Sequence, residues 1–400
     1  MKRLIKSLFT QQMINDFYHL PMAILANIVY SSPAGKLKVI GVTGTDGKTT
    51  TVNMIYRILK AAGKKVSMIS TINAPGFHTT SPGPFTIQKF AKESVRNSDE
   101  YLVLEVTSHA LDQFRFWGIK FDVGVVTNIT HEHLDYHQTF ENYQKTKLKL
   151  LKNARKAVVN KKIREYEDFR VFREKAITFG LEKGDFNQKE LKLKLKVPGD
   201  YNIENALAAL AVAYVLDIDK NVAQTALENF DGINGRMEEV KNKNGIRIFI
   251  DFAHTPNGLE QALKSLRSQL SRTASGRLLA IIGAEGDRDT GKRAMMGEIA
   301  QKLANLVIVT AVDPRGQLEV INKDIAGGAV KAGAKEGINF FVINDRTEAI
   351  ELAVNRLAKK GDIVGIFGKG HETTMNLDGK EVPWSDKETV IEALQSSYGS

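Results

Sequence analysis

The sequence predicts an α/β protein in which a central domain of the P-loop parallel-sheet type is followed by a C-terminal Rossmann-like α/β domain. After Pro33 the chain repeats one unit, in which a short β-branched run is followed by a Gly-rich or polar turn and a helical pattern. This alternation is typical of parallel sheets covered by helices. After residues 232–237 the alternation starts again with a new strand pattern. A length of 400 residues also exceeds the usual size of one domain, so two or three domains are expected.

Three apolar runs are the predicted strands of the first sheet. Residues 38–43, 101–106 and 122–127 are rich in Val, Leu and Ile, as expected of strands that are buried on both faces. Polar residues follow each run directly. Ligands of open parallel sheets bind beyond the carboxyl ends of the strands, so these polar groups are expected to converge on one crevice.

The rest of the chain contains a weakly patterned stretch, a clear helix and a second set of strands. Residues 149–196 are rich in Lys and are expected to form peripheral elements, whereas the Ala-rich residues 202–213 predict a tightly packed helix. The expected organisation is an N-terminal segment over 1–36, a central domain over 37–234 and a C-terminal domain over 235–400. The strands of the last domain are predicted at 246–251, 277–283, 306–311, 339–343 and 362–367.

Composition excludes several classes of site. The chain has no Cys, which rules out disulfides, thiolate zinc sites and Cys nucleophiles and is compatible with a reducing cytoplasm. Its net charge of +10 suits phosphorylated substrates, acidic membranes or nucleic acid alike. No zinc-finger, helix-turn-helix or RNA-binding signature accompanies the charge, so nucleic acid is not expected as a partner.

The N-terminal segment combines basic and apolar residues. Three basic residues lie within the first six, and an apolar stretch over 17–30 follows. This stretch is short and is interrupted by His19, Pro21 and Asn27, so it is not expected to span a bilayer or to act as a signal peptide. Two interpretations remain open, a helix packed on the protein's own surface or an interfacial helix resting on an anionic membrane. The expected location is cytoplasmic, with peripheral contact at the inner face of the membrane as an option.

The strongest local motif is Gly44-Thr-Asp-Gly-Lys-Thr-Thr50, which lies between a predicted strand and a helical pattern. Backbone amides of such a loop cradle phosphate oxygens, while Lys48 is placed to reach the terminal phosphates and the Thr49 hydroxyl suits a magnesium ligand. The spacing GxxGK[ST] is shorter than the usual P-loop form, since Val42 occupies the first glycine position. The motif predicts an ATP-binding loop, against the alternative of a glycine-rich turn without a ligand.

Two further constellations follow the second and third predicted strands. Glu105 opens Glu-Val-Thr-Ser-His-Ala-Leu-Asp-Gln at 105–113, and His133 lies within Asn-Ile-Thr-His-Glu-His-Leu-Asp-Tyr-His at 128–137. A carboxylate and an imidazole at strand ends that face a phosphate loop favour a magnesium site, with Glu105 and His133 as ligands. Three His within seven residues also allow zinc, but a solvated loop is the more frequent explanation when HExxH spacing is absent.

Six motifs in order resemble the Mur ligases of peptidoglycan synthesis, and within them the branch that adds the third amino acid of the stem peptide. They are the three motifs above, Asp-Phe-Ala-His-Thr-Pro at 251–256, Gly-Asp-Arg-Asp-Thr-Gly-Lys-Arg at 286–293 and Gly-Lys-Gly-His-Glu at 368–372. The resemblance covers residues 39 to about 386. It implies an ATP-dependent ligase that transfers the γ-phosphoryl group to a peptide carboxylate and then forms an amide with an incoming amine. It also implies that closure of the two domains excludes water from the acyl phosphate.

The resemblance further implies roles for individual residues. Lys48, Glu105, His133 and Lys147 form the catalytic set, in which Thr49, Glu105, His133 and Lys147 as a carbamate hold magnesium. The implied acceptor-binding residues are Thr79, Thr80, Ser108 and His137, and the amino acid is met by Arg288, Arg315, Gly368 and Glu372. The implied ATP-binding residues are Gly44, Thr45, Asp46, Gly47, Lys48, Thr49, Thr50, Asn205, Arg236, Asp251 and His254.

Two features depart from the family pattern. Typical members place a UDP-binding domain before the phosphate loop, and the sequence is expected to lack it, so the acceptor is expected to be held through its peptide, by a partner or as a lipid-linked precursor. Diaminopimelate-adding members read Asp-Asn-Pro-Arg where this chain has Val312-Asp-Pro-Arg315. The retained Arg315 favours diaminopimelate over lysine as the added amino acid.

Two other functions compete with this one. A folylpolyglutamate-synthetase-like ligase also begins with an early phosphate loop, but that family favours Gly-Lys-Gly-Ser where this chain has Gly47-Lys-Thr-Thr50. A noncatalytic ATP-binding scaffold derived from a ligase is the alternative from another class. Phosphate release that depends on both acceptor and amine separates a ligase from such a scaffold.

Overall fold

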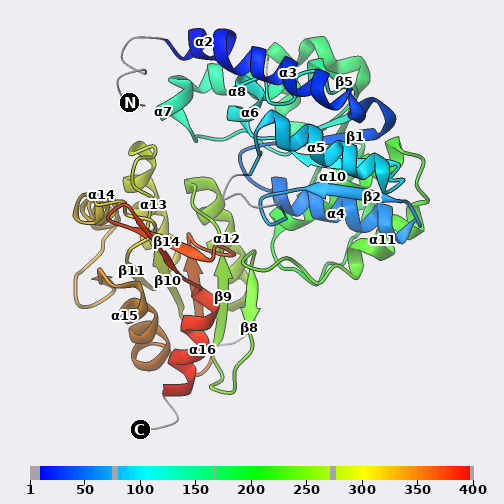
Figure 1. The fold of residues 1–400 in the computed structure, drawn as a ribbon. Coiled ribbons are helices and arrows are strands. Elements are labelled where there is room, and N and C mark those ends of the chain that lie inside the picture. The colour runs from blue at the N-terminus through cyan, green and yellow to red at the C-terminus, as the bar shows by residue number, and fades with distance from the viewer. Residues whose placement is uncertain (1–9, 74–79, 166, 271–275, 397–400) are drawn as a thin grey trace. The chain divides into compact units, whose positions relative to one another are not determined.

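The computed structural model describes residues 10–73, 80–165, 167–270 and 276–396 and divides the chain into two compact units (Figure 1). Unit 1 comprises the chain up to Ile129 together with His137–Lys196 and Tyr201–Phe230. Unit 2 comprises Thr130–Tyr136, Val197–Asp200 and the chain from Asp231 onward.

A seven-stranded parallel sheet forms the centre of unit 1, in the order β2-β3-β1-β4-β5-β6-β7. Strand β1 pairs with β3 on one side and with β4 on the other, so the order reverses at β1. The loop after β1 therefore opens at the switch point of the sheet, where α/β proteins bind ligands. The strands are β1 (Lys38–Thr43), β2 (Val66–Ile69), β3 (Tyr101–Glu105), β4 (Phe121–Val126), β5 (Ala154–Asn160), β6 (Ala176–Gly180) and β7 (Phe186–Asn187).

The predicted strands of this sheet are confirmed. Residues 149–196, which were expected to form peripheral elements, also contribute strands to this sheet. The apolar runs of β1, β3 and β4 are buried almost throughout, as parallel strands covered on both faces must be. The Lys-rich stretch contributes β5, β6 and β7, which extend the same sheet to one edge. In β5 the adjacent charged residues Arg155 and Lys156 are exposed, and the rest of the strand is buried.

Helices cover the sheet of unit 1. Helix α4 starts at Lys48, directly after the phosphate loop, and α10 buries a run of Ala, which allows close backbone packing, as predicted from residues 202–213. The helices are α4 (Lys48–Ala61), α5 (Pro84–Arg96), α6 (Ser108–Asp112), α8 (Phe140–Lys152), α9 (Gln188–Leu191), α10 (Asp200–Val215) and α11 (Lys220–Glu228), with 3-10 helices η2 (Pro33–Lys36), η3 (Lys161–Glu165) and η4 (Glu167–Lys175). The short helix α7 (Leu134–His137) lies mostly in the segment that groups with unit 2.

The N-terminal segment is helical. It consists of α2 (Gln11–Ile14), the π-helix η1 (Asn15–His19) and α3 (Leu20–Tyr30), and α3 packs against α5. Within the described residues, no helix is both long enough and apolar enough to cross a membrane.

Unit 2 has a six-stranded sheet in the order β12-β11-β10-β13-β9-β8, in which only β8 is antiparallel to its neighbour. The five strands predicted for this region are confirmed, and β8 and the hairpin β14-β15 were not predicted. The strands are β8 (Glu238–Val240), β9 (Arg247–Asp251), β10 (Leu278–Ile282), β11 (Leu306–Val309), β12 (Phe340–Val342), β13 (Ile363–Phe367), β14 (Thr374–Leu377) and β15 (Lys380–Pro383). The helices are α12 (Pro256–Leu270), α13 (Gly291–Leu303), α14 (Leu318–Lys331), α15 (Arg346–Glu351), the π-helix η5 (Leu352–Leu357) and α16 (Asp386–Ser396).

Candidate active site

The lysine of the phosphate loop between β1 and α4 binds backbone carbonyls of the same loop. Lys48 Nζ donates to the carbonyls of Gly44 at 3.1 Å and Thr45 at 2.8 Å, so the ammonium lies over the loop. Gly47 caps α4 with a φ of 80°, and a Cβ at this position would lie 2.2 Å from Asn205 Oδ1. Only glycine fits there, because the backbone is left-handed and α10 approaches closely. The N-terminus of α4 and its dipole thus face the place where phosphate binds in such loops.

The rest of the loop is fixed by neutral hydrogen bonds. The Asp46 amide donates to Asn128 Oδ1 at 2.9 Å, and the hydroxyls of Thr45 and Tyr143 lie 3.1 Å apart. Thr50 is buried, and Asn205 accepts a 3.3 Å hydrogen bond from the Thr51 hydroxyl. The loop is therefore shaped before any ligand binds.

Glu105 meets the phosphate loop as predicted from its place at the end of β3. Thr49 Oγ1 lies 3.0 and 3.1 Å from the two carboxylate oxygens of Glu105. The amide and hydroxyl of Thr71, in the turn after β2, also donate to Glu105 Oε2, at 2.8 and 3.0 Å. Glu105 is only 2% exposed, so a buried carboxylate and a Thr hydroxyl share one polar site beside the loop.

Lys147 lies on the other side of the same loop. This residue of α8 is 1% exposed, and its Nζ donates to the Gly44 carbonyl at 2.6 Å and lies 4.5 Å from the centre of the Tyr143 ring. Lysine is rarely buried so completely. Lys48 and Lys147 therefore both bind the carbonyl of Gly44, one from within the loop and one from α8.

Ser108 and His137, two residues of the predicted acceptor set, are in contact. His137 Nε2 lies 3.0 Å from Ser108 Oγ, and both side chains are buried. Burial lowers the pKa of His137 to about 4, with a smaller contribution from Lys147. The imidazole is therefore neutral near pH 7. Thr80 is partly buried near the start of α5, and Thr79 lies outside the described residues.

The histidine-rich segment is divided between the two units. His137 belongs to unit 1, whereas His131 and His133 lie in Thr130–Tyr136, which groups with unit 2. His131 Nε2 lies 3.4 Å from Asp289, and His133 Nδ1 lies 3.9 Å from Glu132. Among the described residues, no three or more His, Asp or Glu side chains are grouped so that they could hold a metal ion. The zinc alternative and the pairing of Glu105 with His133 both stay predictions.

The predicted nucleotide contacts of unit 2 gather after β9. The Asp251 carboxylate accepts from the amides of Met237 at 2.7 Å and Ala253 at 2.8 Å. The Arg236 guanidinium stacks 4.3 Å from the centre of the Phe252 ring, and the His254 ring lies 4.6 Å from the same ring. Arg236, Asp251 and His254 therefore belong to one compact cluster around Phe252.

A group of charged residues follows β10 and β11. Glu285 Oε2 accepts from Arg288 Nε at 2.9 Å and lies 3.9 Å from Arg315. Burial alone would raise the pKa of Glu285, but the charges of His254, Arg288 and Lys292 outweigh burial and lower it to about 2. Glu285 is thus ionised and holds together the two arginines predicted to grip the amino acid.

A second ionic group follows β13, at Gly368-Lys-Gly-His-Glu372. Lys369 is 1% exposed and donates to Asp313 Oδ1 at 2.9 Å and to Glu372 Oε2 at 2.6 Å. Burial raises the pKa of Glu372 to about 7 although Lys369 opposes this shift. Asp313 and Arg315 both adopt left-handed backbone, with φ of 43° and 51°. Such conformations concentrate at functional sites, where the surrounding structure sustains their cost.

A buried ion pair supports both loops of this region. Arg346 is paired in bidentate fashion with Asp386 at 2.7 and 2.8 Å, and it also donates to the carbonyls of Ala311 at 3.3 Å and Phe367 at 3.0 Å. These carbonyls immediately precede the segments that carry Arg315 and Gly368. Arg346 therefore fixes the position of these two segments relative to each other.

The structure brings together the predicted residues within each unit. In unit 1 these are the phosphate loop, Glu105, Lys147 and Asn205, and in unit 2 Arg288, Arg315, Gly368 and Glu372. Five residues of these sites carry no role predicted from the sequence. Tyr143 and Thr71 carry no motif signal, Glu285 lies just before a motif, Lys369 lies inside one, and Asp313 was noted only as a departure from the family pattern.

Comparison with known families gives two matches along the chain. Residues 42–213 match the model of the Mur ligase middle domain, and residues 235–370 match that of the Mur ligase glutamate ligase domain. Together the two matches include the phosphate loop, Glu105, Lys147, Arg315 and Gly368.

Individual relatives cover nearly the whole chain. UDP-N-acetylmuramoyl-L-alanyl-D-glutamate--2,6-diaminopimelate ligase 1 of Clostridium acetobutylicum is 36% identical over 94% of this chain and 82% of its own length. UDP-N-acetylmuramyl-tripeptide synthetase of Borreliella burgdorferi is 36% identical over 94% of this chain and 80% of its own length. A solved UDP-N-acetylmuramoyl-L-alanyl-D-glutamate--2,6-diaminopimelate ligase is 28% identical, with a TM-score of 0.58 over 91% of this chain and 79% of that chain.

Proposed function

This chain belongs to the Mur ligase family of ATP-dependent ligases, and we propose that it joins diaminopimelate to the terminal carboxylate of a muramoyl peptide. The product would be a precursor of peptidoglycan. The observation that carries this proposal is the contact of Thr49 and Glu105, 3.0 Å apart at a phosphate loop whose Gly44 carbonyl is bound by the buried Lys147. It supplies oxygen ligands for a cation where two anionic substrates must meet.

The donor set at this contact fits magnesium. Mg²⁺ prefers oxygen ligands and commonly binds through one or two protein groups together with phosphate oxygens and water. Thr49 and Glu105 would hold magnesium, and the family resemblance implies His133 and a carbamate on Lys147 as further ligands. Magnesium bound there supplies neutralisation of the negative charge on the phosphates and the carboxylate.

In the proposed reaction the γ-phosphoryl group moves from ATP to the peptide carboxylate and leaves ADP. The amine then attacks the acyl carbon, the C–N bond forms, and inorganic phosphate leaves as the ammonium proton is lost. The chain contributes position and charge, because a carboxylate and a phosphoryl group repel each other until cations intervene. Lys48 and the N-terminus of α4 would orient the phosphates, and Ser108 with neutral His137 would hold the acceptor peptide by hydrogen bonds.

The ionic groups of unit 2 support a zwitterionic amino acid as the second substrate. Arg288 and Arg315 suit a carboxylate, since guanidinium binds it in bidentate fashion, and Glu372 suits a distal ammonium group. Diaminopimelate carries one more carboxylate than lysine, and the retained Arg315 favours it. Val312 is 1% exposed and faces Gly283 and Gly368, so it serves packing and leaves the recognition of charge to its neighbours.

A direct assay tests this proposal. The purified chain is incubated with ATP, magnesium and UDP-N-acetylmuramoyl-L-alanyl-D-glutamate, and with diaminopimelate or lysine in separate reactions. Phosphate release that requires acceptor and amine together, with a product mass increased by one diaminopimelate residue, is the expected result. ATP hydrolysis that ignores the amine would contradict the ligase, and a product formed only with lysine would contradict the proposed amine.

A further inference from the structure

We propose that unit 1 docks on an anionic phospholipid surface through the outward side of α2, η1 and α3 and through a cationic pocket that borders these helices. This inference does not depend on the proposed ligase reaction.

The N-terminal helices bury small and polar side chains and expose large apolar ones, which is the reverse of an ordinary surface helix. Their inward side carries small and polar residues, with Asn15, Ala23, Ala26 and Asn27 buried. Their outward side, which we call the apolar face, carries large apolar residues, although a surface helix normally turns such residues to the core. The apolar face consists of Met13, Phe17, Tyr18, Leu25, Ile28 and Val29, which are 41%, 79%, 59%, 47%, 68% and 55% exposed.

Specific hydrogen bonds hold this orientation. Asn15 Nδ2 donates to Asp112 at 2.7 Å, and Asn27 Nδ2 donates to the Trp117 carbonyl at 3.2 Å. Gly118 leaves no space for a side chain, since a Cβ there would lie 2.0 Å from Asn27 Nδ2. The polar side of the helices is thus fitted to unit 1, and rotation that would bury the apolar face would break these contacts.

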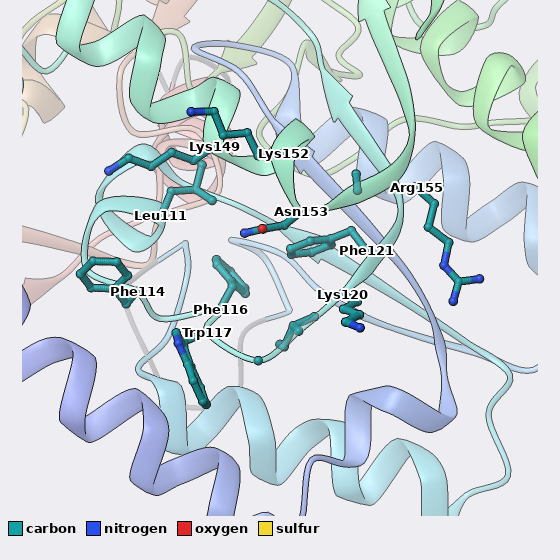
Figure 2. A pocket seen from close by; sticks show the side chains of 13 residues that line it. Leu111, Phe114, Phe116, Trp117, Lys120, Phe121, Lys149, Lys152, Asn153 and Arg155 are labelled. Atoms are coloured by element: carbon teal, nitrogen blue, oxygen red, sulfur yellow. The ribbon is translucent and has the colours of Figure 1, made fainter. Parts of the chain in front are cut away.

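A pocket of about 670 Å3 borders the same helices (Figure 2). Its aromatic lining comes from Phe114, Phe116, Trp117 and Phe121. Figure 2 shows Trp117 pointing from this lining toward the blue N-terminal helices. Trp117 is 40% exposed, and its carbonyl is the one bound by Asn27. Trp117 therefore links the pocket to the N-terminal helices through their inward side.

The charges at the pocket are positive. Lys120, Lys149, Lys152 and Arg155 line it, and its lining includes neither Asp nor Glu. Asp112 and Asp122, which do not line the pocket, pair with Lys149 at 2.9 Å and Arg155 at 3.6 Å, so a positive surplus remains. In addition, residues 1–38 contain five basic residues and one acidic residue, and residues 17–30 contain no charged residue.

An anionic bilayer matches this combination better than other occupants. Apolar side chains enter the boundary between headgroups and acyl chains, aromatic rings favour the same depth, and Lys and Arg attract anionic lipid. A pocket with aromatic walls and cations suits a lipid phosphate and the adjoining glycerol. Residues 1–9 are poor candidates for the pocket, because their three basic residues would be repelled by its cations.

Vesicle flotation of the full chain tests the proposal. Binding is measured to vesicles of phosphatidylglycerol and phosphatidylcholine in equal parts and to vesicles of phosphatidylcholine alone. We expect clear preference for the anionic vesicles. The double variant Phe17→Ser/Ile28→Ser should bind them at least ~10-fold more weakly, and Lys152→Glu/Arg155→Glu at least ~20-fold more weakly, since each cation contributes roughly a factor of five.

Matched variants separate this surface from general hydrophobicity and charge. Val171→Ser/Ile338→Ser removes two apolar side chains that are 83% and 72% exposed elsewhere. Lys189→Glu/Lys220→Glu makes the same change in net charge at exposed lysines of unit 1. Both controls should bind as the unchanged chain does, and thermal unfolding should show all four variants folded.

Four results would overturn the proposal. They are equal binding to both kinds of vesicle, equal losses in the matched variants, and release from vesicles by inorganic phosphate, which would indicate a site for soluble anions. The fourth is absence of vesicle binding together with self-association that Phe17→Ser/Ile28→Ser abolishes, which would indicate an interface between proteins.

Discussion

The carboxyl edges of the two sheets carry polar sites that are built in different ways. In unit 1 the phosphate loop is held by hydrogen bonds to backbone, amide and carboxylate oxygens, including the amide of Asp46 on Asn128, the hydroxyl of Thr49 on Glu105 and the ammonium of Lys147 on the Gly44 carbonyl. In unit 2 the site is held by opposite charges, with Glu285 between Arg288 and Arg315 and Lys369 between Asp313 and Glu372.

The two sites are therefore expected to respond differently to binding. The site of unit 1 has its shape before a ligand binds, whereas in unit 2 the substrate replaces partners in the internal ion pairs. Hydrogen bonds within a tight loop fix its shape whether or not phosphate is present. Ion pairs in a buried site satisfy charges that would otherwise be costly, and a zwitterionic substrate can replace each partner by a group of the same sign. We therefore expect changes in unit 1 to lower kcat, and changes in unit 2 to raise the KM for the amine.

The largest expected effect is that of Lys48→Ala. Loss of the ammonium that lies over the phosphate loop should lower kcat by about 10³-fold while the KM for the amine stays unchanged. Steady-state phosphate release measures both constants. Lys60→Ala, which removes an exposed lysine from the same helix, should have normal activity, and an equal loss there would contradict a specific role of Lys48.

Lys147 offers a second test of unit 1. If this buried lysine acts as a carbamate, Lys147→Ala should lower kcat by about 10²-fold, and Lys147→Arg should not restore it because guanidinium does not form the carbamate. Removal of CO2 from the buffer should lower the activity of the unchanged chain, and bicarbonate should restore it. Full activity of Lys147→Arg would show that positive charge alone suffices.

Arg315→Met tests the exchange of ion pairs in unit 2. The KM for diaminopimelate should rise about 30-fold, which corresponds to the loss of one charge-assisted carboxylate contact of about 2 kcal/mol. The KM for ATP should not change. Arg267→Met, a change at an exposed arginine whose guanidinium donates to Leu303, is the control.

The raised pKa of Glu372, about 7, predicts a pH dependence of amine binding. A carboxyl group with this pKa is ionised at pH 8 and protonated at pH 6, so its attraction for a distal ammonium is lost as the pH falls. The KM for diaminopimelate should therefore rise about tenfold from pH 8 to pH 6. Glu372→Gln should remove this dependence, and an unchanged profile in that variant would assign it to another group.

The smallest expected effect compares the two glycines that flank helix α4, Gly47 before it and Gly63 after it. Gly47→Ala places a Cβ 2.2 Å from Asn205 Oδ1 at a φ of 80°, whereas Gly63→Ala, at a φ of 71°, meets nothing within 4 Å. Both variants carry the cost of left-handed backbone, about 1–2 kcal/mol. Gly47→Ala should lose about 1 kcal/mol more in the free energy of unfolding, measured with urea, because of its clash. Equal losses in the free energy of unfolding would mean that α10 shifts to accommodate the new Cβ at little cost.

The strands and motifs of both units were predictable because their signals are local. Each central strand is a short apolar run, and Gly44–Thr50 and Glu105 stand at strand ends where ligands of such sheets bind. Lys147 was one lysine among many until a family resemblance singled it out. Lys369 and Asp313 lie 56 positions apart, and no local pattern indicates that they pair.

By itself, the sequence determined the alternation of strands and helices, the place of the phosphate loop and the uncharged character of residues 17–30. Only the tertiary structure decided that Asn15 and Asn27 face inward while Phe17 and Ile28 face solvent. It also decided which charges of unit 2 neutralise one another. The physical reason is that burial and ion pairing depend on neighbours distant in the chain, whereas strand and turn preferences are set by adjacent residues.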